Sequence, residues 1–482
     1  MPGAAASLLF LSLLVLESSA VQFDFKVAPP KAATASNNNL DSVGNNRYIT
    51  NITISGNVVP VLIDTGSTDL WVAPPQGLTN FNDTGLSTTV RYGDGSTFVS
   101  GDIGVGAFSL DGQFTVPFQA YLNVASEAGE DPDLDIGIFG LLGLGFETNG
   151  GSEINNAVQH AQGPEATWGQ SVLSNIFAQN PDSSNFMGIA LSRLGDQEGS
   201  ADGSLTIAEY DPDYESVQNS PKLSQTPAGS GTWSIVLDSF KVGGNPITWP
   251  STLSAAPAGK NIVLLDTGTT NILMPQAQVN AIYSTIPGAV LTQDPNIPLA
   301  HVSESHNVWV VPCTAEINVA TTFAGQDFAI HPLDVTDMGI IQSPDGTHNF
   351  TVCLNAFTDI GLIGQGETDA LFGDSFLRNV YTAFDFGTGG PTKGTPFVQM
   401  LSTTDATKSA ADFTAVRAAA MQNMPPELKP IDLIRVFNGS LNAADAVPVS
   451  TDSKKNDASR RTFAPGMGVV LGGFLLGFST LF

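Results

Sequence analysis

Short runs of alternating apolar and polar residues, separated by glycines, fill most of the chain up to about residue 400. Residues 48–54 and 114–123 show this alternation, which is typical of half-buried β-strands. Residues 186–191 and 233–241 are two further strand candidates. The pattern therefore predicts a mostly β protein.

A smaller part of the chain has helical spacing. Residues 168–179 place Val172, Ile176 and Phe177 on one helix face. Residues 275–286 begin with a proline, which is favoured in the first turn of a helix. Residues 413–421 could form a third helix. We therefore expect a few short helices beside the strands.

An apolar run that ends in Asp-Thr-Gly occurs twice, at residues 61–68 and 263–270. A buried strand holds the aspartate at its end rigidly, and the glycine lets the chain turn sharply past it. If the two copies pack about a pseudo-twofold axis, the carboxylates of Asp64 and Asp266 meet, and two like charges this close share one proton. Such a pair can activate water against a peptide carbonyl without a metal ion or a covalent intermediate.

These motifs resemble those of the pepsin-like aspartic proteases, and the resemblance runs from about residue 48 to residue 400. It implies that Asp64 and Asp266 are the catalytic pair. The resemblance implies that Thr65 and Thr267 form hydrogen bonds between the two active-site loops. It also implies that the hydroxyls of Ser67 and Thr269 bond the catalytic carboxylates. The supporting residues are therefore Thr65, Gly66, Ser67, Thr267, Gly268 and Thr269. Leu70-Trp71-Val72 and the apolar-apolar-Gly signatures at 141–145 and 371–374 also match the family.

The resemblance implies a bilobal pepsin-like fold, with two pseudo-twofold-related β lobes and a few short helices. A turn-rich stretch at residues 211–214 places the boundary between the lobes near residue 216. We expect an N-terminal lobe at residues 47–215 and a C-terminal lobe at residues 216–401. Residues 21–46 would be a short propeptide or N-terminal segment, where family members usually carry a long basic propeptide.

A hairpin is predicted at residues 91–96, because Tyr92 precedes Gly93-Asp94-Gly95 and Asp-Gly is a strong turn pair. It resembles the flap of the pepsin-like family, which covers an extended substrate. Trp71 is either a hydrogen-bond partner beneath Tyr92 or an ordinary core residue. Asp94 either pairs with a cationic substrate side chain before the scissile bond, as in fungal relatives that accept Lys, or is a solvated turn residue.

The charge balance narrows the choice of partners. The chain has 46 acidic and 18 basic residues among 482, so its formal net charge is −28. Nucleic acid is therefore not an expected partner. The acidic balance suits a protein that stays folded in acid, although any secreted acidic protein would share it. We expect a polypeptide substrate, a monomer, and no metal ion or organic cofactor.

The chain has two cysteines, Cys313 and Cys353. In a secreted chain they form a disulfide or remain two free buried thiols. The pair resembles the disulfide of the C-terminal lobe in the pepsin-like family, whereas the usual bridge of the N-terminal lobe after the Trp is missing.

Both ends of the chain resemble targeting signals. Residues 1–20 carry a short apolar run and then small residues, which predicts a secretory signal and not a membrane anchor. Residues 402–465 are rich in Ala, Thr, Asp and Lys and are predicted to form a stalk or linker. Residues 466–482 are apolar and resemble a GPI-attachment signal with Asn456 as the attachment residue, and a tail-anchored helix is the alternative.

The predicted location is therefore the secretory pathway and then the cell surface or the extracellular space. Four Asn-x-Ser/Thr sequons are glycosylation candidates there: Asn51, Asn82, Asn349 and Asn438.

Two competing motifs fail. Residues 373–376 resemble the nucleophile block of the GDSL-type lipases and esterases, but no histidine follows His348 to act as the base. The five histidines contain no His-Glu-x-x-His zinc motif. We therefore expect an aspartic endopeptidase that works in acid. A pepsin-fold surface protein that binds or inhibits without turnover is the alternative, which the intact dyad and loop hydroxyls oppose.

Overall fold

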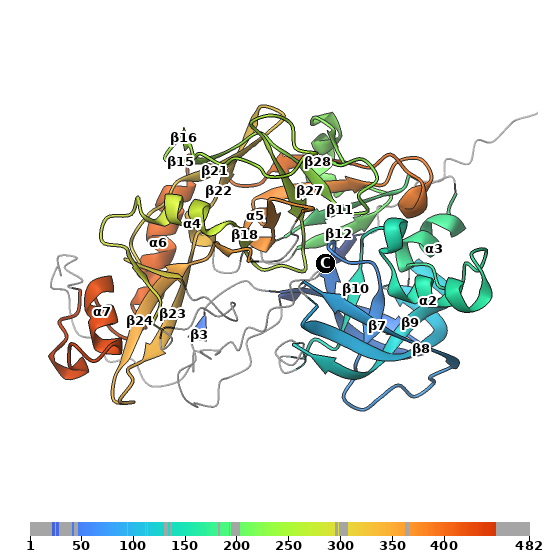
Figure 1. Cartoon of the computed structure of the whole chain (residues 1–482), viewed down its shortest axis with the longest axis horizontal. Helices are drawn as coiled ribbons and strands as arrows, with labels where there is room; N and C mark the ends of the chain where they lie inside the picture. Colours follow the sequence, from blue (N-terminus) through green and yellow to red (C-terminus); the bar gives the residue numbers. More distant parts are fainter. Residues whose placement is uncertain are drawn as a thin grey trace, which may run out of the picture.

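The two halves of the chain form two β lobes that share a central sheet (Figure 1). The computed structural model describes residues 22–24, 26–27, 41–42, 47–93, 95–110, 112, 114–129, 134, 137–181, 184–191, 193, 203–294, 297, 307–361 and 366–449. The predicted mostly β, two-lobed architecture with a few short helices is confirmed. The predicted secretory signal and apolar tail, Asp94 and Asn456 lie outside the described residues.

The N-terminal lobe is built on an eight-stranded sheet. Its strands in spatial order are β2 (Lys26–Val27), β4 (Tyr48–Ile54), β5 (Asn57–Asp64), β10 (Gly140–Gly143), β6 (Leu70–Val72), β9 (Phe114–Ala128), β8 (Thr97–Leu110) and β7 (Asp83–Tyr92). The alternation that predicts a strand at residues 48–54 corresponds to alternating burial along β4. Strand β5 instead ends in four buried residues, which is why its apolar run is continuous.

The C-terminal lobe contains three smaller sheets. The first consists of β14 (Ser234–Leu237), β17 (Asn261–Leu265), β26 (Ala370–Phe372), β18 (Ile272–Met274) and β25 (Thr358–Asp359). The second consists of β16 (Asn245–Pro246), β15 (Ser239–Val242), β21 (Val319–Phe323) and β22 (Gln326–Ile330). The third consists of β19 (Val290–Thr292), β20 (Val308–Val311), β24 (Asn349–Asn355), β23 (Thr336–Gln342) and β3 (Asp41–Ser42).

A six-stranded sheet takes strands from both halves of the chain and joins the lobes. Its order is β1 (Gln22–Asp24), β12 (Ser204–Ile207), β11 (Phe186–Ala190), β27 (Val380–Asp385), β28 (Phe397–Ser402) and β13 (Leu223–Ser224). Buried aromatic rings pack at the junction: Trp233 lies 4.4 Å from Phe146 and 4.6 Å from Phe386 between ring centroids. This core fixes the lobes relative to each other.

Both Asp-Thr-Gly motifs occur in the same strand arrangement. In the N-terminal lobe, β10 runs parallel to β5 and antiparallel to β6. In the C-terminal lobe, β26 runs parallel to β17 and antiparallel to β18. In each lobe a strand from much later in the sequence thus lies between the two strands that flank the motif. This repeated topology agrees with the pseudo-twofold relation that the sequence repeat predicts.

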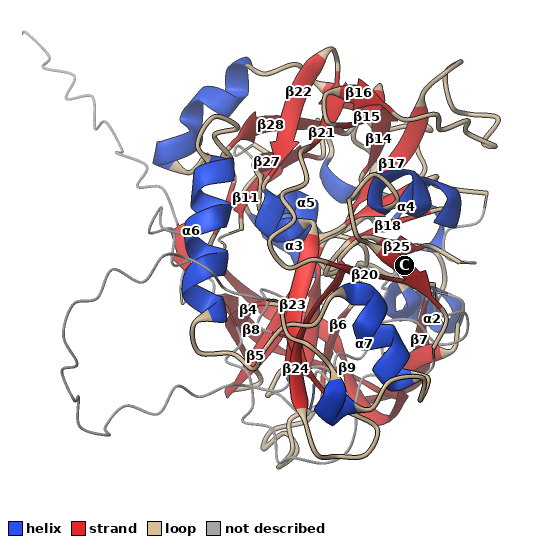
Figure 2. Cartoon of the chain, turned by 90° about the vertical axis from the view of Figure 1, so that its left-hand side faces the viewer, coloured by secondary structure: helices blue, strands red, loops and turns tan. Residues whose placement is uncertain are grey.

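The helices are short (Figure 2), and the four residues of α5 (Asp374–Leu377) are all buried inside the molecule. The helices are α2 (Glu153–Gln162), α3 (Val172–Gln179), α4 (Gln276–Tyr283), α5 (Asp374–Leu377), α6 (Ser409–Met421) and α7 (Pro430–Phe437), with short 3-10 turns at Thr148–Gly150, Pro212–Asn219, Pro332–Asp334, Gly390–Thr392 and Ala443–Asp445. Helix α3 begins later than predicted because Ser171 caps it. Within the described ranges, every helix is too short or too polar to cross a bilayer.

The prediction of a linker that begins at residue 402 is wrong for residues 403–449, which we call the C-terminal extension. The extension packs on the C-terminal lobe, and α7 buries Leu433, Val436 and Phe437 against strands β20, β23 and β24. Helix α6 has a weak sequence signal because the face it buries consists of Ser409, Phe413 and Arg417, spaced four residues apart. A buried helix face with only one apolar side chain among three gives little helical periodicity in the apolar residues of the sequence.

Polar contacts tie the C-terminal extension to the Cys313–Cys353 disulfide, which is present. Arg417 donates from Nη2 to the carbonyl oxygen of Thr336 at 2.7 Å, and its Nη1 lies 3.6 Å from Cys353 Sγ. The carboxylate of Glu427 accepts a hydrogen bond from the Cys313 amide at 2.8 Å. The extension therefore contacts both halves of the disulfide.

The predicted N-terminal segment at residues 21–46 adds strands to three different sheets. Strand β1 pairs with β12 in the shared sheet, β2 pairs with β4 in the N-terminal lobe, and β3 pairs with β23 in the C-terminal lobe. These described pieces are therefore integrated into both lobes.

Candidate active site

The two repeated aspartates lie side by side at the junction of the lobes. Asp64 is the last residue of β5, and Asp266 follows β17 directly. Both side chains are 0 % exposed. The two carboxyl groups interact directly, and two like charges this close share one proton. The fold thus brings together two residues that the sequence places in different halves of the chain.

The two threonines that follow the aspartates cross between the loops. The amide of Thr65 donates to Thr267 Oγ1 at 3.0 Å, and the amide of Thr267 donates to Thr65 Oγ1 at 3.0 Å. Each hydroxyl in turn donates across the junction, to the carbonyl oxygens of Leu265 and Ile63, at 3.0 Å in both cases. These four buried hydrogen bonds fix the spacing of the two aspartates.

Each carboxylate receives the same pair of hydrogen bonds from its own loop. Asp64 accepts from the Gly66 amide at 2.8 Å and from the Ser67 hydroxyl. Asp266 accepts from the Gly268 amide at 2.8 Å and from Thr269 Oγ1 at 2.6 Å. The glycine amide binds Oδ1 and the hydroxyl binds Oδ2, so both oxygens of each carboxylate are held in place, and the hydroxyl bonds are those that the positions of Ser67 and Thr269 predict.

The glycines of the two apolar-apolar-Gly signatures have a steric reason. A Cβ atom on Gly143 would lie 2.3 Å from the carbonyl carbon of Thr68, and one on Gly373 would lie 2.1 Å from the carbonyl oxygen of Thr269. Any side chain at either position would displace an active-site loop. The signature strands β10 and β26 therefore pack directly behind the two loops.

Burial raises the pKa of Asp64 well above the usual range of a carboxyl group, and the negative charge of Asp266 adds to this effect, while the Ser67 hydroxyl opposes it. Burial also raises the pKa of Asp266. Hydrogen bonds from Thr269 and from Asp64 oppose that rise, and so does the positive charge of Arg47. The pair therefore holds a proton more readily than two separate, exposed carboxyl groups would.

The predicted hairpin is present next to the N-terminal loop. Strands β7 and β8 pair up to Tyr92 and Thr97, and Gly93 adopts a φ of 57°, which suits a glycine in a tight turn. Trp71 Nε1 donates to the hydroxyl of Tyr92 at 2.6 Å, so the predicted hydrogen bond exists, and both side chains are buried. Asp94 lies outside the described residues.

A buried ionic cluster lies behind the dyad on the C-terminal side. Asp334 accepts hydrogen bonds from Arg193, from Arg378 Nε at 2.8 Å and from Asn379 Nδ2 at 2.9 Å. Although burial alone raises a carboxyl pKa, the two guanidinium groups hold the pKa of Asp334 below its usual range. Asp334 therefore stays ionised in acid.

Three residues around the second loop have no role predicted from the sequence, although Thr270 and Asp374 lie within the matched motifs: Arg47, Thr270 and Asp374. Arg47 donates from Nη1 to Thr270 Oγ1 at 2.5 Å, and the backbone amide of Asp374 donates to the carbonyl oxygen of Thr269 at 2.8 Å. All three side chains are buried. A basic residue directly before the first strand, in a chain with 18 basic residues, is the only sequence signal for Arg47.

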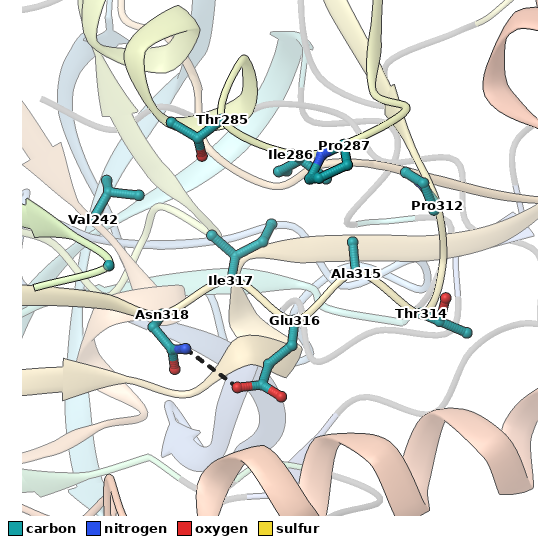
Figure 3. A pocket seen from close by; sticks show the side chains of 11 residues that line it. Val242, Thr285, Ile286, Pro287, Pro312, Thr314, Ala315, Glu316, Ile317 and Asn318 are labelled. Atoms are coloured by element: carbon teal, nitrogen blue, oxygen red, sulfur yellow. Dashed lines mark hydrogen bonds between the residues drawn. The ribbon is translucent and has the colours of Figure 1, made fainter.

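A pocket lies elsewhere, in the C-terminal lobe (Figure 3). It has a volume of about 430 Å³ and is lined by residues 242–243, 285–287, 312 and 314–318. Asn318 donates to Glu316 at 3.2 Å on its wall. None of its lining residues belongs to the Asp-Thr-Gly loops, so the pocket has no part in the chemistry of the dyad.

The four sequon asparagines are all exposed: Asn51, Asn82, Asn349 and Asn438. Asn51 lies on β4, where it pairs with Pro60, but its side chain points away from the core. All four positions are accessible to a glycosylating enzyme.

Two β lobes, each of which contributes one aspartate from an Asp-Thr-Gly loop to a shared pair, define a two-lobed aspartic hydrolase. The family model for eukaryotic aspartyl proteases matches residues 47–390. The chain belongs to this family and is an aspartic-type endopeptidase.

Curated relatives agree with this assignment. The chain is 27% identical over 382 residues to aspergillopepsin-1 of Aspergillus clavatus, covering 75% of this chain and 80% of that protein. It is 28% identical over 354 residues to an aspartic protease of Phaffia rhodozyma, covering 70% of this chain and 73% of that protein.

A solved structure shares the fold. The crystal structure of an aspartic proteinase from Irpex lacteus superposes with a TM-score of 0.52 at 19% sequence identity. The match covers 76% of this chain and 96% of that chain. The predicted pepsin-like fold is thus confirmed.

Proposed function

We propose that this endopeptidase cleaves polypeptides in acid through Asp64 and Asp266, which share one proton. The observation that carries the proposal is the close approach of the two buried carboxyl groups, held by the crossed hydrogen bonds of Thr65 and Thr267. Two carboxyl groups in such contact cannot both be ionised, so one acts as base and the other as acid.

The proposed reaction needs a water molecule and the peptide bond between the two carboxyl groups. The ionised carboxylate removes a proton from water, and the oxygen attacks the peptide carbonyl carbon. The protonated carboxyl hydrogen-bonds the carbonyl oxygen and gives it a proton as the tetrahedral intermediate forms. The proton taken from water then passes to the leaving nitrogen as the carbon–nitrogen bond breaks. One hydroxyl of the intermediate returns its proton to the carboxylate that had given it, so a carboxylic acid and an amine are released and the pair again holds one proton.

Acid operation is supported by several buried carboxyl groups. Burial raises the pKa of seven carboxyl groups in the part of the chain that the structure describes. The folded protein therefore takes up protons more readily than the unfolded chain does. These groups are Asp64, Asp69, Asp266, Asp337, Asp374, Asp385 and Glu427. Such groups favour the folded state at low pH.

Access for a polypeptide requires the surroundings of the dyad to move, since both aspartates are buried. We propose that hairpin β7–β8 opens as a lid and that the Trp71–Tyr92 hydrogen bond holds its closed form. Asp94 at the tip would pair with a lysine before the scissile bond. Unchanged cleavage of lysine-containing peptides by Asp94→Ala would remove that role.

The location of the enzyme follows from its predicted targeting signals. We propose that the chain enters the secretory pathway, is glycosylated on the four exposed sequons, and is held at the cell surface by a GPI anchor on Asn456 as a monomer. Release from cells by a phosphatidylinositol-specific phospholipase tests the anchor, and retention in the membrane would favour a tail helix.

The experiment that tests the chemistry is hydrolysis of denatured haemoglobin or casein at acid pH. We expect Asp64→Asn and Asp266→Asn each to lower kcat by about 10³-fold or more, because an amide can neither take up the water proton nor share one. The exposed Asp213→Asn is the matched control and should keep wild-type activity. A wild-type protein that binds these substrates without cleaving them would favour the non-enzymatic alternative.

A further inference from the structure

A buried arginine approaches the second active-site loop from the other half of the chain. Arg47 directly precedes strand β4 and is 4 % exposed. Its Nη1 donates to Thr270 Oγ1 at 2.5 Å. Thr270 belongs to the loop that Asp266 begins, so a side chain at the start of the N-terminal lobe holds the loop of the C-terminal lobe.

The corresponding position in the first loop has a different partner. Thr68 occupies the place in the first loop that Thr270 occupies in the second, four residues after the aspartate. Its hydroxyl donates to the carbonyl oxygen of Phe146 at 2.7 Å, which is a neutral group. The pseudo-twofold relation therefore breaks at this position, and a full positive charge lies on one side only.

Other charged groups near Asp266 have to be considered together with the positive charge of Arg47. Asp64 lies in direct contact, and Asp374 lies behind the loop, where its negative charge and that of Asp266 interact unfavourably. Arg378 also faces Asp374, but its Nε binds Asp334 at 2.8 Å. The positive charge of Arg47 acts on both Asp374 and Asp266.

An arginine is suited to this place because its guanidinium stays protonated at every pH at which the protein is folded. A fixed positive charge near one member of a carboxyl pair favours the ionised form of that member. The hydrogen bond to Thr270 adds a geometric restraint on the same loop.

We propose that Arg47 is a positioning residue for peptide hydrolysis: it holds the second loop through Thr270 and keeps the negative charge of the pair on Asp266. This proposal rests on the proposed dyad mechanism. Asp266 is then the base that takes the proton of water, and Asp64 is the acid that hydrogen-bonds the substrate carbonyl. The residue directly before β4 thus contributes to the chemistry of the opposite lobe.

The test is the pH profile of kcat/KM for a peptide substrate. Arg47→Met removes the charge and keeps much of the volume. We expect the acid limb of its profile, which reports ionisation of the pair, to move up by about one pH unit, so that activity below the limb falls about tenfold. Arg47→Lys keeps a charge, and its acid limb should stay within a few tenths of a unit of wild type while kcat falls several-fold.

Two further variants separate charge from geometry. Thr270→Val removes the hydroxyl that Arg47 binds but leaves the cation, so we expect a lower kcat with the acid limb unchanged. Lys241→Met removes a cation that pairs with Asp327 at 2.7 Å in a partly exposed ion pair on β15, and should change neither quantity.

An acid limb of Arg47→Met at the wild-type pH would overturn the proposal, and so would an equal shift in Arg47→Lys. If Arg47→Met does not fold, a wild-type kcat in both Arg47→Lys and Thr270→Val would overturn it. Failure of the proposed dyad mechanism can be told apart from failure of the Arg47 proposal. If the dyad mechanism is wrong, activity will survive Asp64→Asn, whatever the Arg47 variants do.

Discussion

Thr65 and Thr267 each donate a backbone amide to the hydroxyl of the other at 3.0 Å, across the junction of the two lobes. Both residues are 1% exposed. The spacing of the two Asp-Thr-Gly loops is therefore set by buried side chains other than the aspartates. This relationship leads to a first prediction.

Thr65→Val should lower both stability and kcat. The substitution leaves the Thr267 amide and the Leu265 carbonyl oxygen buried without their partner, and each unsatisfied group costs about 1–3 kcal/mol. Thr65→Ser keeps the hydroxyl and serves as the control. Thermal unfolding and kcat at the optimal pH provide the measurement, and a Thr65→Val enzyme as stable and active as Thr65→Ser would contradict the role of the crossed bonds.

Arg417→Met in the C-terminal extension should destabilise the whole C-terminal lobe. The substitution removes the hydrogen bonds of Arg417 to the carbonyl oxygen and hydroxyl of Thr336, at 2.7 and 2.8 Å. We expect a loss of about 2–4 kcal/mol in the free energy of unfolding, measured by denaturant titration. Lys408→Met next to the same helix is the control, since its side chain is 73% exposed.

A chain that ends at residue 402 should fail to fold. Truncation exposes the apolar surface that Leu433, Val436 and Phe437 cover and removes Glu427 from the Cys313 amide. Soluble, active enzyme without the C-terminal extension would show that the extension is an attached linker after all.

The protein should gain stability as the pH falls from 7 towards 4, and Asp69 should account for part of this gain. Burial raises the pKa of Asp69 from 3.8 to about 6, although Ser152 and the first amides of α2 donate to its carboxylate. A carboxyl group with a raised pKa contributes stability that is fully present below the unfolded value of 3.8 and is lost as the pH rises through 6.

Asp69→Asn imitates the protonated carboxyl group and tests this assignment. We expect it to raise the free energy of unfolding at pH 7 by up to about 3 kcal/mol and to change it little at pH 4. Asp213→Asn, at an exposed position, is the control. An equal effect of Asp69→Asn at both pH values would contradict the assignment.

His331 should have the opposite pH dependence. Burial lowers its pKa from 6.5 to about 4, and the charge of Arg193 adds to this effect, while Asp334 and Asp412 oppose it. A base with a lowered pKa contributes full stability above the unfolded value of 6.5, and this stability is lost as the pH falls through 4.

His331→Asn keeps a side-chain acceptor for the Leu333 amide, which His331 Nδ1 accepts at 3.1 Å. The variant cannot be protonated, so its stability relative to wild type should improve as the pH falls from 7 to 4. Thermal unfolding across this range measures the trend, and a constant difference between the two proteins would refute it.

Local patterns were sufficient for the strands and for the dyad. Strand β4 alternates in burial as its sequence alternates in polarity, and the apolar runs before Asp64 and Asp266 are strands without a polar face. The repeat itself placed the two aspartates in equivalent loops, because a duplicated strand and turn folds in the same way twice. The order of the motifs along the chain also predicted two lobes.

Contacts between residues far apart in the sequence decided the placement of the C-terminal extension and the pairing of buried charges. The C-terminal extension is composed like a linker, and its place on the lobe depends on a helix face that contains Ser409 and Arg417 beside Phe413. The residue type does not show whether a charged side chain is buried or exposed to solvent. Only the fold shows that a buried charge is paired.

The sequence by itself therefore determined the two Asp-Thr-Gly loops, their hydroxyl and glycine neighbours and the β character of both halves, because each depends on residues a few positions apart. Tertiary structure alone decided that Arg47 contacts Thr270, which lies in the other half of the chain, and that residues 403–449 complete the C-terminal lobe. The physical reason is that packing and charge pairing join positions far apart in the chain, and no local period records them.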